Sequence, residues 1–208
     1  MKILLAIPPS EFLVDDRAFP FLGPLQIAAV ARLEGHEVEV ADLTGHNRRC
    51  PKATHGACGA DVRREAQDAL VEHVRRFDPT VVGVYSLAPQ HPAAVGLLRA
   101  VKREAPRLPV LLGGPHASTA PDKCMREGWD FVVVSDQGGG GGEPGFLDAL
   151  RRIECHGEPA IVREPSRARG GSKLDYVNDQ WPWPARDLID LASYRYEVDG
   201  RRTAHVVT

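Results

Sequence analysis

Short apolar runs alternate with longer segments of helical period along this chain. The strand candidates are residues 2–7, 37–41, 80–85, 110–112 and 131–134. The helix candidates, in which apolar side chains recur every three or four positions, are residues 23–34, 60–77, 90–105, 122–127 and 143–153. The run at 80–85 is rich in β-branched residues, as central strands buried on both faces are. The alternation predicts strand–helix–strand units around a parallel sheet.

We therefore predict an α/β fold of the flavodoxin-like (Rossmann-like) type, with a five-stranded parallel sheet and helices on both faces. Residues 160–163 are a possible further short strand. The predicted domain covers residues 1–163, and residues 164–208 form a C-terminal linker and extension. Residues 165–172 are rich in Arg, Gly and Ser, as linkers are. The tail beyond them has aromatic residues but too few apolar ones to fold alone, so we expect it to pack on the main domain or on a part that this sequence does not contain.

Composition places the chain among ordinary globular proteins, with 43% hydrophobic and 26% charged residues. The formal net charge of −2 provides no field of one sign that would gather nucleic acid or anionic lipid, and neither partner is expected. The apolar start of the chain is too short for a signal segment or a membrane span, and Pro8-Pro9 ends it. We expect a cytoplasmic protein whose 4 cysteines are reduced thiols.

Two loops have alternative interpretations. His46, Cys50, His55 and Cys58 could form a zinc knot, but paired close spacings are lacking and a polar loop is favoured. The glycine run at 138–142 could cradle a phosphate, but it lacks the flanking residues of known phosphate loops, so a mobile loop is favoured.

In an open parallel sheet, ligands bind at the carboxyl ends of the strands. Ser86-Leu87-Ala88 ends the third predicted strand with a small hydroxyl, and Gly113-Gly114-Pro115-His116 ends the fourth. Paired glycines would let a bulky ligand approach the backbone, although they could equally serve a tight turn. For His116 we favour a pocket-wall or bracing role over metal ligation. Pro8, Pro9 and Ser135, at the ends of two other predicted strands, complete the candidate binding residues.

Several segments, in order and at similar spacing, resemble one family. The matching segments are Ile3-Leu4-Leu5-Ala6-Ile7-Pro8-Pro9, Gly23-Pro24-Leu25, Leu33-Glu34-Gly35-His36-Glu37-Val38, Asp42-Leu43, residues 79–86, Gly113-Gly114-Pro115-His116, residues 128–133 and residues 182–187. Together they resemble the N-terminal cobalamin-binding domain of cobalamin-dependent radical S-adenosylmethionine enzymes, many of which are methyltransferases. The resemblance extends over nearly the whole chain.

The resemblance implies a cobalamin whose nucleotide tail lies between the sheet and a helix, lined by Ser86, Leu87, Gly113 and Gly114. Many cobalamin domains ligate cobalt with a histidine from an Asp-x-His-x-x-Gly motif after the first strand. This chain lacks the motif, and its first loop, residues 8–16, contains no histidine. We therefore expect cobalamin bound with its own base displaced (base-off) and without a histidine from that loop.

The chain departs from the family at two places. A Gly-Glu-Gly-Glu element usually follows the fifth strand, where this chain has Ser135-Asp136-Gln137 and the glycine run. The family also continues into a barrel whose Cys-x-x-x-Cys-x-x-Cys motif holds an iron–sulfur cluster, whereas this sequence ends at Thr208. We expect a binding module that needs a radical S-adenosylmethionine barrel, in cis or in trans, for chemistry, so that the cluster and S-adenosylmethionine belong to a full-length relative.

Two other classes of function remain as alternatives. One is an enzyme or binding domain that acts alone on a nucleotide or flavin, for which the sequence offers no nucleophile–base pairing or metal-ligand spacing. The other is a receiver-type interaction domain, which needs a phosphate-accepting aspartate at the end of the third strand, where this chain has Ser86.

Overall fold

The computed structural model describes residues 1–13, 15–45, 57–135, 142–163, 182–195 and 197–203. Its centre is a sheet of 6 parallel strands in the order β2-β1-β3-β4-β5-β6. The strands are β1 (Lys2–Ile7), β2 (Glu37–Asp42), β3 (Val81–Tyr85), β4 (Val110–Gly113), β5 (Phe131–Val134) and β6 (Ala160–Arg163). Chain order reverses between β1 and β3, so the carboxyl ends of these two strands flank the point where ligands bind in such sheets.

The parallel α/β class is confirmed, but the predicted number of strands was one too few. Residues 160–163, noted only as a possible strand, pair in parallel with β5 along its whole length. Such a short run carries little pattern of its own, and it becomes a strand because β5 offers a free edge for hydrogen bonding.

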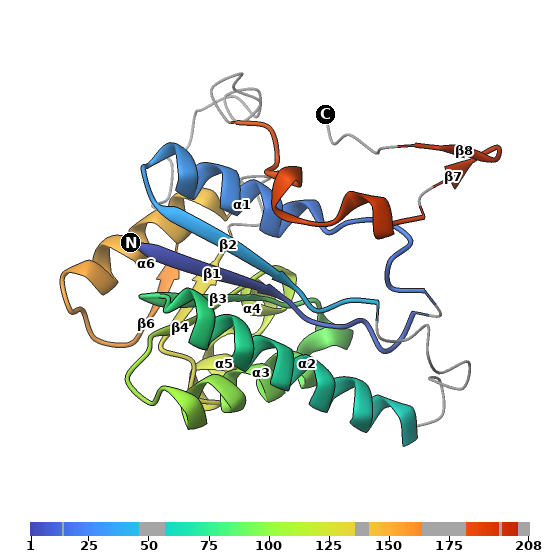
Figure 1. Cartoon of the computed structure of the whole chain (residues 1–208). Coiled ribbons are helices and arrows are strands. Elements are labelled where there is room, and N and C mark those ends of the chain that lie inside the picture. Colours follow the sequence, from blue (N-terminus) through green and yellow to red (C-terminus); the bar gives the residue numbers. More distant parts are fainter. Residues whose placement is uncertain (14, 46–56, 136–141, 164–181, 196, 204–208) are drawn as a thin grey trace.

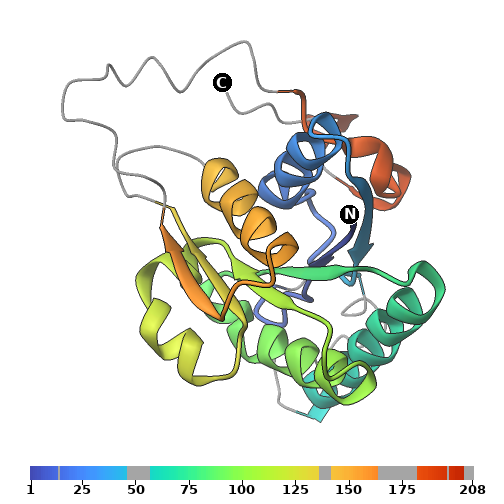
Figure 2. The same ribbon diagram turned by 90° about the vertical axis from the view of Figure 1, so that its left-hand side faces the viewer.

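Helices cover both faces of the sheet (Figures 1 and 2). One face carries α1 (Leu22–Leu33) and α6 (Glu143–Glu154), and the other carries α2 (Ala57–Phe77), α3 (His91–Glu104), α4 (Pro115–Thr119) and α5 (Pro121–Arg126). Alternate residues of each strand point to opposite faces, so the sheet builds two hydrophobic cores. Leu4, Val82 and Leu112 belong to one core, whereas Ile3, Val81 and Leu111 belong to the other.

Helix ends follow local sequence signals. Gly35 has φ +83° directly after α1, where a left-handed residue ends the helix. Proline lies in the first turn of α3, α4, α5 and α6, where its missing N–H costs no hydrogen bond. Helix α4 was not predicted from the sequence, because a helix of 5 residues shows too little periodicity.

The described part of the C-terminal extension packs beside α1, as expected for a segment that cannot fold alone. It contains the 3₁₀ turns η4 (Arg186–Leu188) and η5 (Leu191–Ser193) and a small antiparallel pair, β7 (Glu197–Val198) and β8 (Arg201–Arg202). The amide of Ala185 donates to the carbonyl of Leu25, and Arg32 of α1 pairs with Asp187 at 2.7 Å. Most of the predicted linker lies outside the described residues.

Candidate cobalamin site

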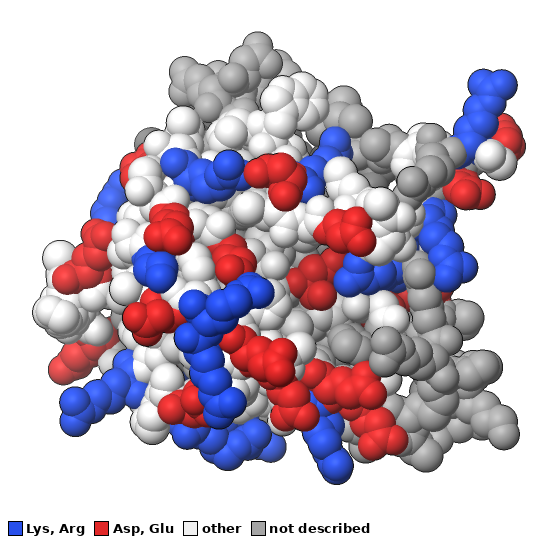
Figure 3. Space-filling model, viewed as in Figure 1, with Lys and Arg blue, Asp and Glu red and all other residues white. Residues whose placement is uncertain are grey.

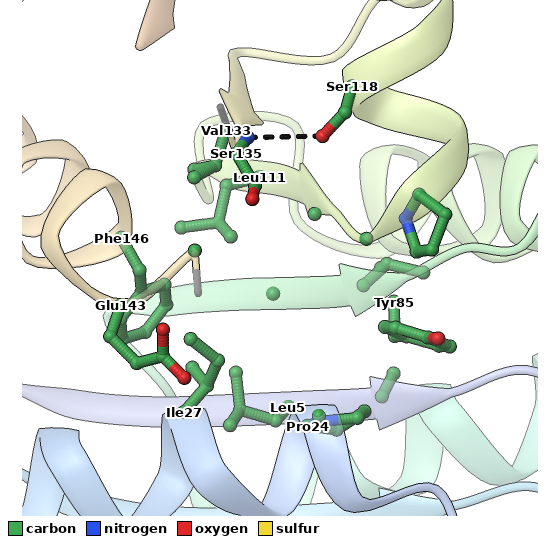
Figure 4. A pocket seen from close by; sticks show the side chains of 18 of the residues that line it. Leu5, Pro24, Ile27, Tyr85, Leu111, Ser118, Val133, Ser135, Glu143 and Phe146 are labelled. Atoms are coloured by element: carbon green, nitrogen blue, oxygen red, sulfur yellow. Dashed lines mark hydrogen bonds between the residues drawn. The ribbon is translucent and has the colours of Figure 1, made fainter. Parts of the chain in front are cut away.

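A pocket of about 490 Å³ lies between the sheet and the helix pair α1 and α6 (Figure 4). Its volume is within the range of small-molecule sites, about 300–1,000 Å³. The lining residues come from β1, β3, β4 and β5, from the start of α1, from α4 and the residue before it, and from the start of α6. They are Leu5, Ala6, Gly23, Pro24, Ile27, Gly83, Val84, Tyr85, Leu111, Gly113, Gly114, Pro115, Ser118, Thr119, Val133, Ser135, Gly142, Glu143 and Phe146.

The floor of the pocket is apolar and depends on a glycine in the middle of a central strand. Leu5 of β1, Leu111 of β4 and Val133 of β5 project on the α1 and α6 side of the sheet. A Cβ at Gly83, which lies between Leu5 and Leu111, would come within 2.7 Å of the Leu5 Cδ2 atom and 3.2 Å of the Leu111 Cδ1 atom. Because a glycine inside a strand permits close approach, Gly83 lets the Leu5 and Leu111 side chains close over it to form the floor.

The two glycines after β4 serve different purposes. Gly114 has φ +98°, and a Cβ there would lie 2.9 Å from both the Ser86 carbonyl oxygen and the Tyr85 ring. It is therefore required by the turn and by close backbone approach. A Cβ at Gly113 would meet nothing within 4 Å, although Gly113 lines the pocket. The alternatives of tight turn and ligand slot thus apply to different residues of the pair.

Hydrogen bonds hold the two loops together at this edge. The Ser86 amide donates to the Gly113 carbonyl at 2.9 Å, and the His116 amide donates to the Ser86 carbonyl at 3.1 Å. The Ser135 amide donates to Ser118 Oγ at 3.0 Å, which joins the end of β5 to α4 (Figure 4). The rim of the pocket is therefore fixed by bonds between backbone segments.

Polar side chains are few in this pocket. Among the described lining residues, Glu143 is the single charged side chain, and its carboxyl group points into the pocket (Figure 4). Burial raises the pKa of Glu143, because removal from water penalises the carboxylate form. Burial likewise raises the pKa of the Tyr85 phenol. The Glu143 carboxyl and the Tyr85 hydroxyl can form specific hydrogen bonds with a ligand in otherwise apolar surroundings.

Four of the ten predicted binding residues line the pocket, namely Gly113, Gly114, Pro115 and Ser135. The other six, Pro8, Pro9, Ser86, Leu87, Ala88 and His116, lie at the same edge of the sheet outside its lining. Their roles in binding stay predictions.

The structure shows what some of these six residues contact. Ser86 is fully buried, and its hydroxyl lies 3.1 Å from the Leu87 carbonyl and 3.2 Å from His91 Nδ1, so it braces the loop. The Pro8 carbonyl accepts a hydrogen bond from Gln90 Nε2. The His116 ring stacks on His91 with centroids 3.8 Å apart. Burial and the neighbouring His91 lower the pKa of His116, which favours the neutral ring.

Sequence reasoning missed the pocket floor and Glu143. The floor residues look like ordinary core positions, because only their surroundings show that a cavity lies above them. Gly83 was the available signal. Gly142 and Glu143, at the start of α6, line the pocket. The rest of the glycine run and the proposed zinc-knot side chains lie outside the described residues.

A second polar cluster joins the extension to the end of β2. The Tyr194 hydroxyl donates to Asp42 Oδ2 at 2.6 Å, and the Arg17 guanidinium lies over the Tyr194 ring and 3.4 Å from Asp42. Burial, with the Asp42 carboxylate, raises the pKa of Tyr194 above its usual value. Arg17 also donates to the Thr44 carbonyl and to Ser193. The cluster holds the extension against the domain.

Comparison with known proteins identifies the class. Residues 19–139, more than half of the chain, match the family model of the B12 binding domain. The chain therefore belongs to the B12-binding family, and the apolar pocket at the carboxyl edge of its sheet is the candidate cobalamin site.

One curated relative also aligns with nearly the whole chain. It is the protein of Pyrococcus horikoshii named "Uncharacterized methyltransferase PH0819", which is 27% identical over 212 residues. The alignment covers 96% of this chain and 41% of the relative, so the chain spans about two fifths of that protein's length.

The described surface gives two further observations. Lys and Arg are interspersed with Asp and Glu over the face drawn in Figure 3. Several of these charges are paired, such as Arg75 with Glu104 at 2.8 Å. Within the described residues, every helix is too short or too polar to cross a membrane.

Proposed function

We propose that this chain is the cobalamin-binding module of a cobalamin-dependent radical S-adenosylmethionine enzyme of methyltransferase type. The observation that carries the proposal is the pocket between the sheet and α1 and α6, which opens beside the two glycines after β4 in a chain of the B12-binding family. The name of the Pyrococcus relative and its greater length support a methyltransferase with further domains. We expect the protein to act in the cytoplasm.

The residues present fit the nucleotide tail of cobalamin. A flat heteroaromatic base suits the apolar floor, where Leu5, Leu111 and Val133 face Ile27 and Phe146 across the pocket. Ser118, Ser135 and Glu143 would take the polar groups of the tail. Bound cobalamin would supply a cobalt centre that carries a methyl group. This chain's own residues would bind the tail, exclude water from it and orient the ring system over the carboxyl edge.

The same arrangement supports the expected base-off state. A base held in the pocket would be unavailable to cobalt, and the first loop contains no histidine that could replace it. The chain also has no Cys-x-x-x-Cys-x-x-Cys motif, so the proposed radical step requires a barrel outside the printed sequence. A receiver domain needs a phosphate-accepting aspartate at the end of β3. This chain has Ser86 there, and its side chain is buried, so the position does not support a receiver function.

Cobalamin binding is tested by incubating the purified chain with hydroxocobalamin and measuring visible absorbance after gel filtration. We expect co-elution and a base-off spectrum. Ile27→Trp would fill the pocket with an indole and abolish co-elution, whereas Leu33→Trp, on the same helix at a position 63% exposed, would leave it intact. Free cobalamin in every sample, with a folded protein, would refute the proposal.

The radical enzyme context needs a separate test. Sequencing the transcript downstream of the Thr208 codon should reveal the three-cysteine motif, or a neighbouring gene should encode it. A barrel produced from that sequence should bind the chain in pull-down experiments. If neither reading frame encodes the motif, the radical part of the proposal is wrong even if cobalamin binds.

A further inference from the structure

A second cluster of potential ligand side chains lies on the other face of the sheet. His91 begins α3, His116 lies in α4 and Cys124 lies in α5. One ligand atom from each of these three residues lies within 4.8 Å of the other two. Three separate helices thus bring two imidazoles and a thiol to one place.

The hydrogen bonds of this cluster orient its nitrogen atoms. Glu127 Oε2 lies 2.7 Å from His91 Nε2, so the carboxylate holds that nitrogen as an N–H donor and leaves the lone pair on Nδ1. The Ser86 hydroxyl lies 3.2 Å from that Nδ1 atom, and a bound ion would take its place. Among the described residues, the buried Nε2 atom of His116 has no hydrogen-bond partner. Cys124 is fully buried and not in a disulfide. A buried polar atom without a partner is costly, so the orphaned nitrogen favours the binding of a partner such as an ion.

We propose that His91, His116 and Cys124 bind a zinc-type divalent cation. Neutral imidazole and thiolate are the donors that Zn²⁺ prefers, at about 2.0–2.3 Å. Tetrahedral bonds of that length place donor atoms about 3.3–3.8 Å apart, so the cluster must close by about 1 Å. The stacked His91 and His116 rings would also turn so that both lone pairs meet the ion. The carboxylate of Glu127 on His91 is the partner that metal-bound histidines commonly have.

Such an ion would join α3, α4 and α5 beneath the rim of the cobalamin pocket. The α4 helix directly follows Gly113 and Gly114, and the Ser86 hydroxyl lies 3.2 Å from His91. The ion would therefore stabilise the two loops that border the pocket. This role does not depend on cobalamin, so it is tested without that cofactor.

The experiment uses the whole chain, stripped with a chelator and titrated with Zn²⁺ or Co²⁺. We expect one Zn²⁺ per chain, a melting temperature higher by about 5–10 °C at a hundredfold excess over Kd, and a thiolate-to-metal charge-transfer band with Co²⁺. Cys124→Ser and His116→Asn should lose the band and the thermal shift. The matched controls Cys155→Ser, at an exposed thiol, and His156→Asn, at an exposed ring, should retain both.

The same assay separates this site from the sequence-proposed zinc knot. Loss of the band in a Cys50→Ser/Cys58→Ser variant, with retention in Cys124→Ser, would overturn the proposal. Absence of the band in the unaltered chain would also overturn it. X-ray absorption of the zinc-loaded unaltered chain should show one sulfur and two imidazole ligands, which keeps the test decisive if a variant fails to fold.

Discussion

Alanine substitutions at the two glycines after β4 should affect different properties of the protein. At Gly114 a methyl group meets the Ser86 carbonyl oxygen and the Tyr85 ring, each at 2.9 Å, and the backbone has φ +98°. At Gly113 the methyl group meets no protein atom within 4 Å and projects into open space beside the pocket. The first change acts on the fold, and the second acts on the ligand.

The magnitudes follow from these contacts. An L-residue in this region of backbone conformation costs about 1–3 kcal/mol, and the Ser86 carbonyl cannot move away without losing the hydrogen bond from the His116 amide. We expect Gly114→Ala to lower the free energy of unfolding by about 2–4 kcal/mol and Tm by about 5–15 °C. Gly113→Ala should change the free energy by less than about 1 kcal/mol, since alanine suits a strand better than glycine does.

The assays are urea denaturation for stability and equilibrium dialysis for cobalamin affinity. Gly113→Ala should weaken cobalamin binding at least about tenfold, equivalent to about 1.4 kcal/mol, while the unfolding curve stays nearly unchanged. Gly114→Ala should shift the unfolding midpoint even without cobalamin.

Two results would contradict this reasoning. A Gly114→Ala protein as stable as the original would show that neither the backbone conformation nor the close approach constrains the turn. Unchanged cobalamin affinity in Gly113→Ala would mean that the ligand does not pass over this part of the pocket.

Three further predictions concern neighbouring groups. Burial raises the pKa of Glu143, so the contribution of its protonated form to stability is complete below pH 4.5 and is lost as pH rises through the folded-state pKa. Glu143→Gln should therefore flatten the decline of Tm with pH, measured in thermal melts over a pH series. An unchanged decline would mean that another group causes it. Tyr194→Phe removes the hydrogen bond to Asp42 and should cost about 1.5–3 kcal/mol in urea denaturation; an unaltered midpoint would show that the extension contributes nothing there. Gly83→Ala should push the Leu5 side chain into the pocket, which should cost about 1–3 kcal/mol of stability and weaken cobalamin binding. Unchanged cobalamin affinity would show that these residues do not form the floor of the cobalamin site.

Local sequence signals predicted most elements correctly. The β-branched run of β3 and the helical periods of α1, α2, α3 and α6 are strong patterns, because a buried strand or an amphipathic helix needs them in any context. The short elements were harder: β6 was noted only as a possibility and α4 was missed. Each takes its structure from neighbours, β6 from the free edge of β5 and α4 from the turn at Gly114.

The sequence by itself determined the class of fold and the edge of the sheet where a ligand would bind, because strands joined by helices pair in parallel and their carboxyl ends share one edge. Only the tertiary structure decided which side chains meet there. It separated the structural Gly114 from the open Gly113, buried Ser86 as a brace, and opened a pocket above Gly83 with Glu143 inside it. These outcomes depend on packing between residues distant in the chain, which local sequence periodicity does not encode.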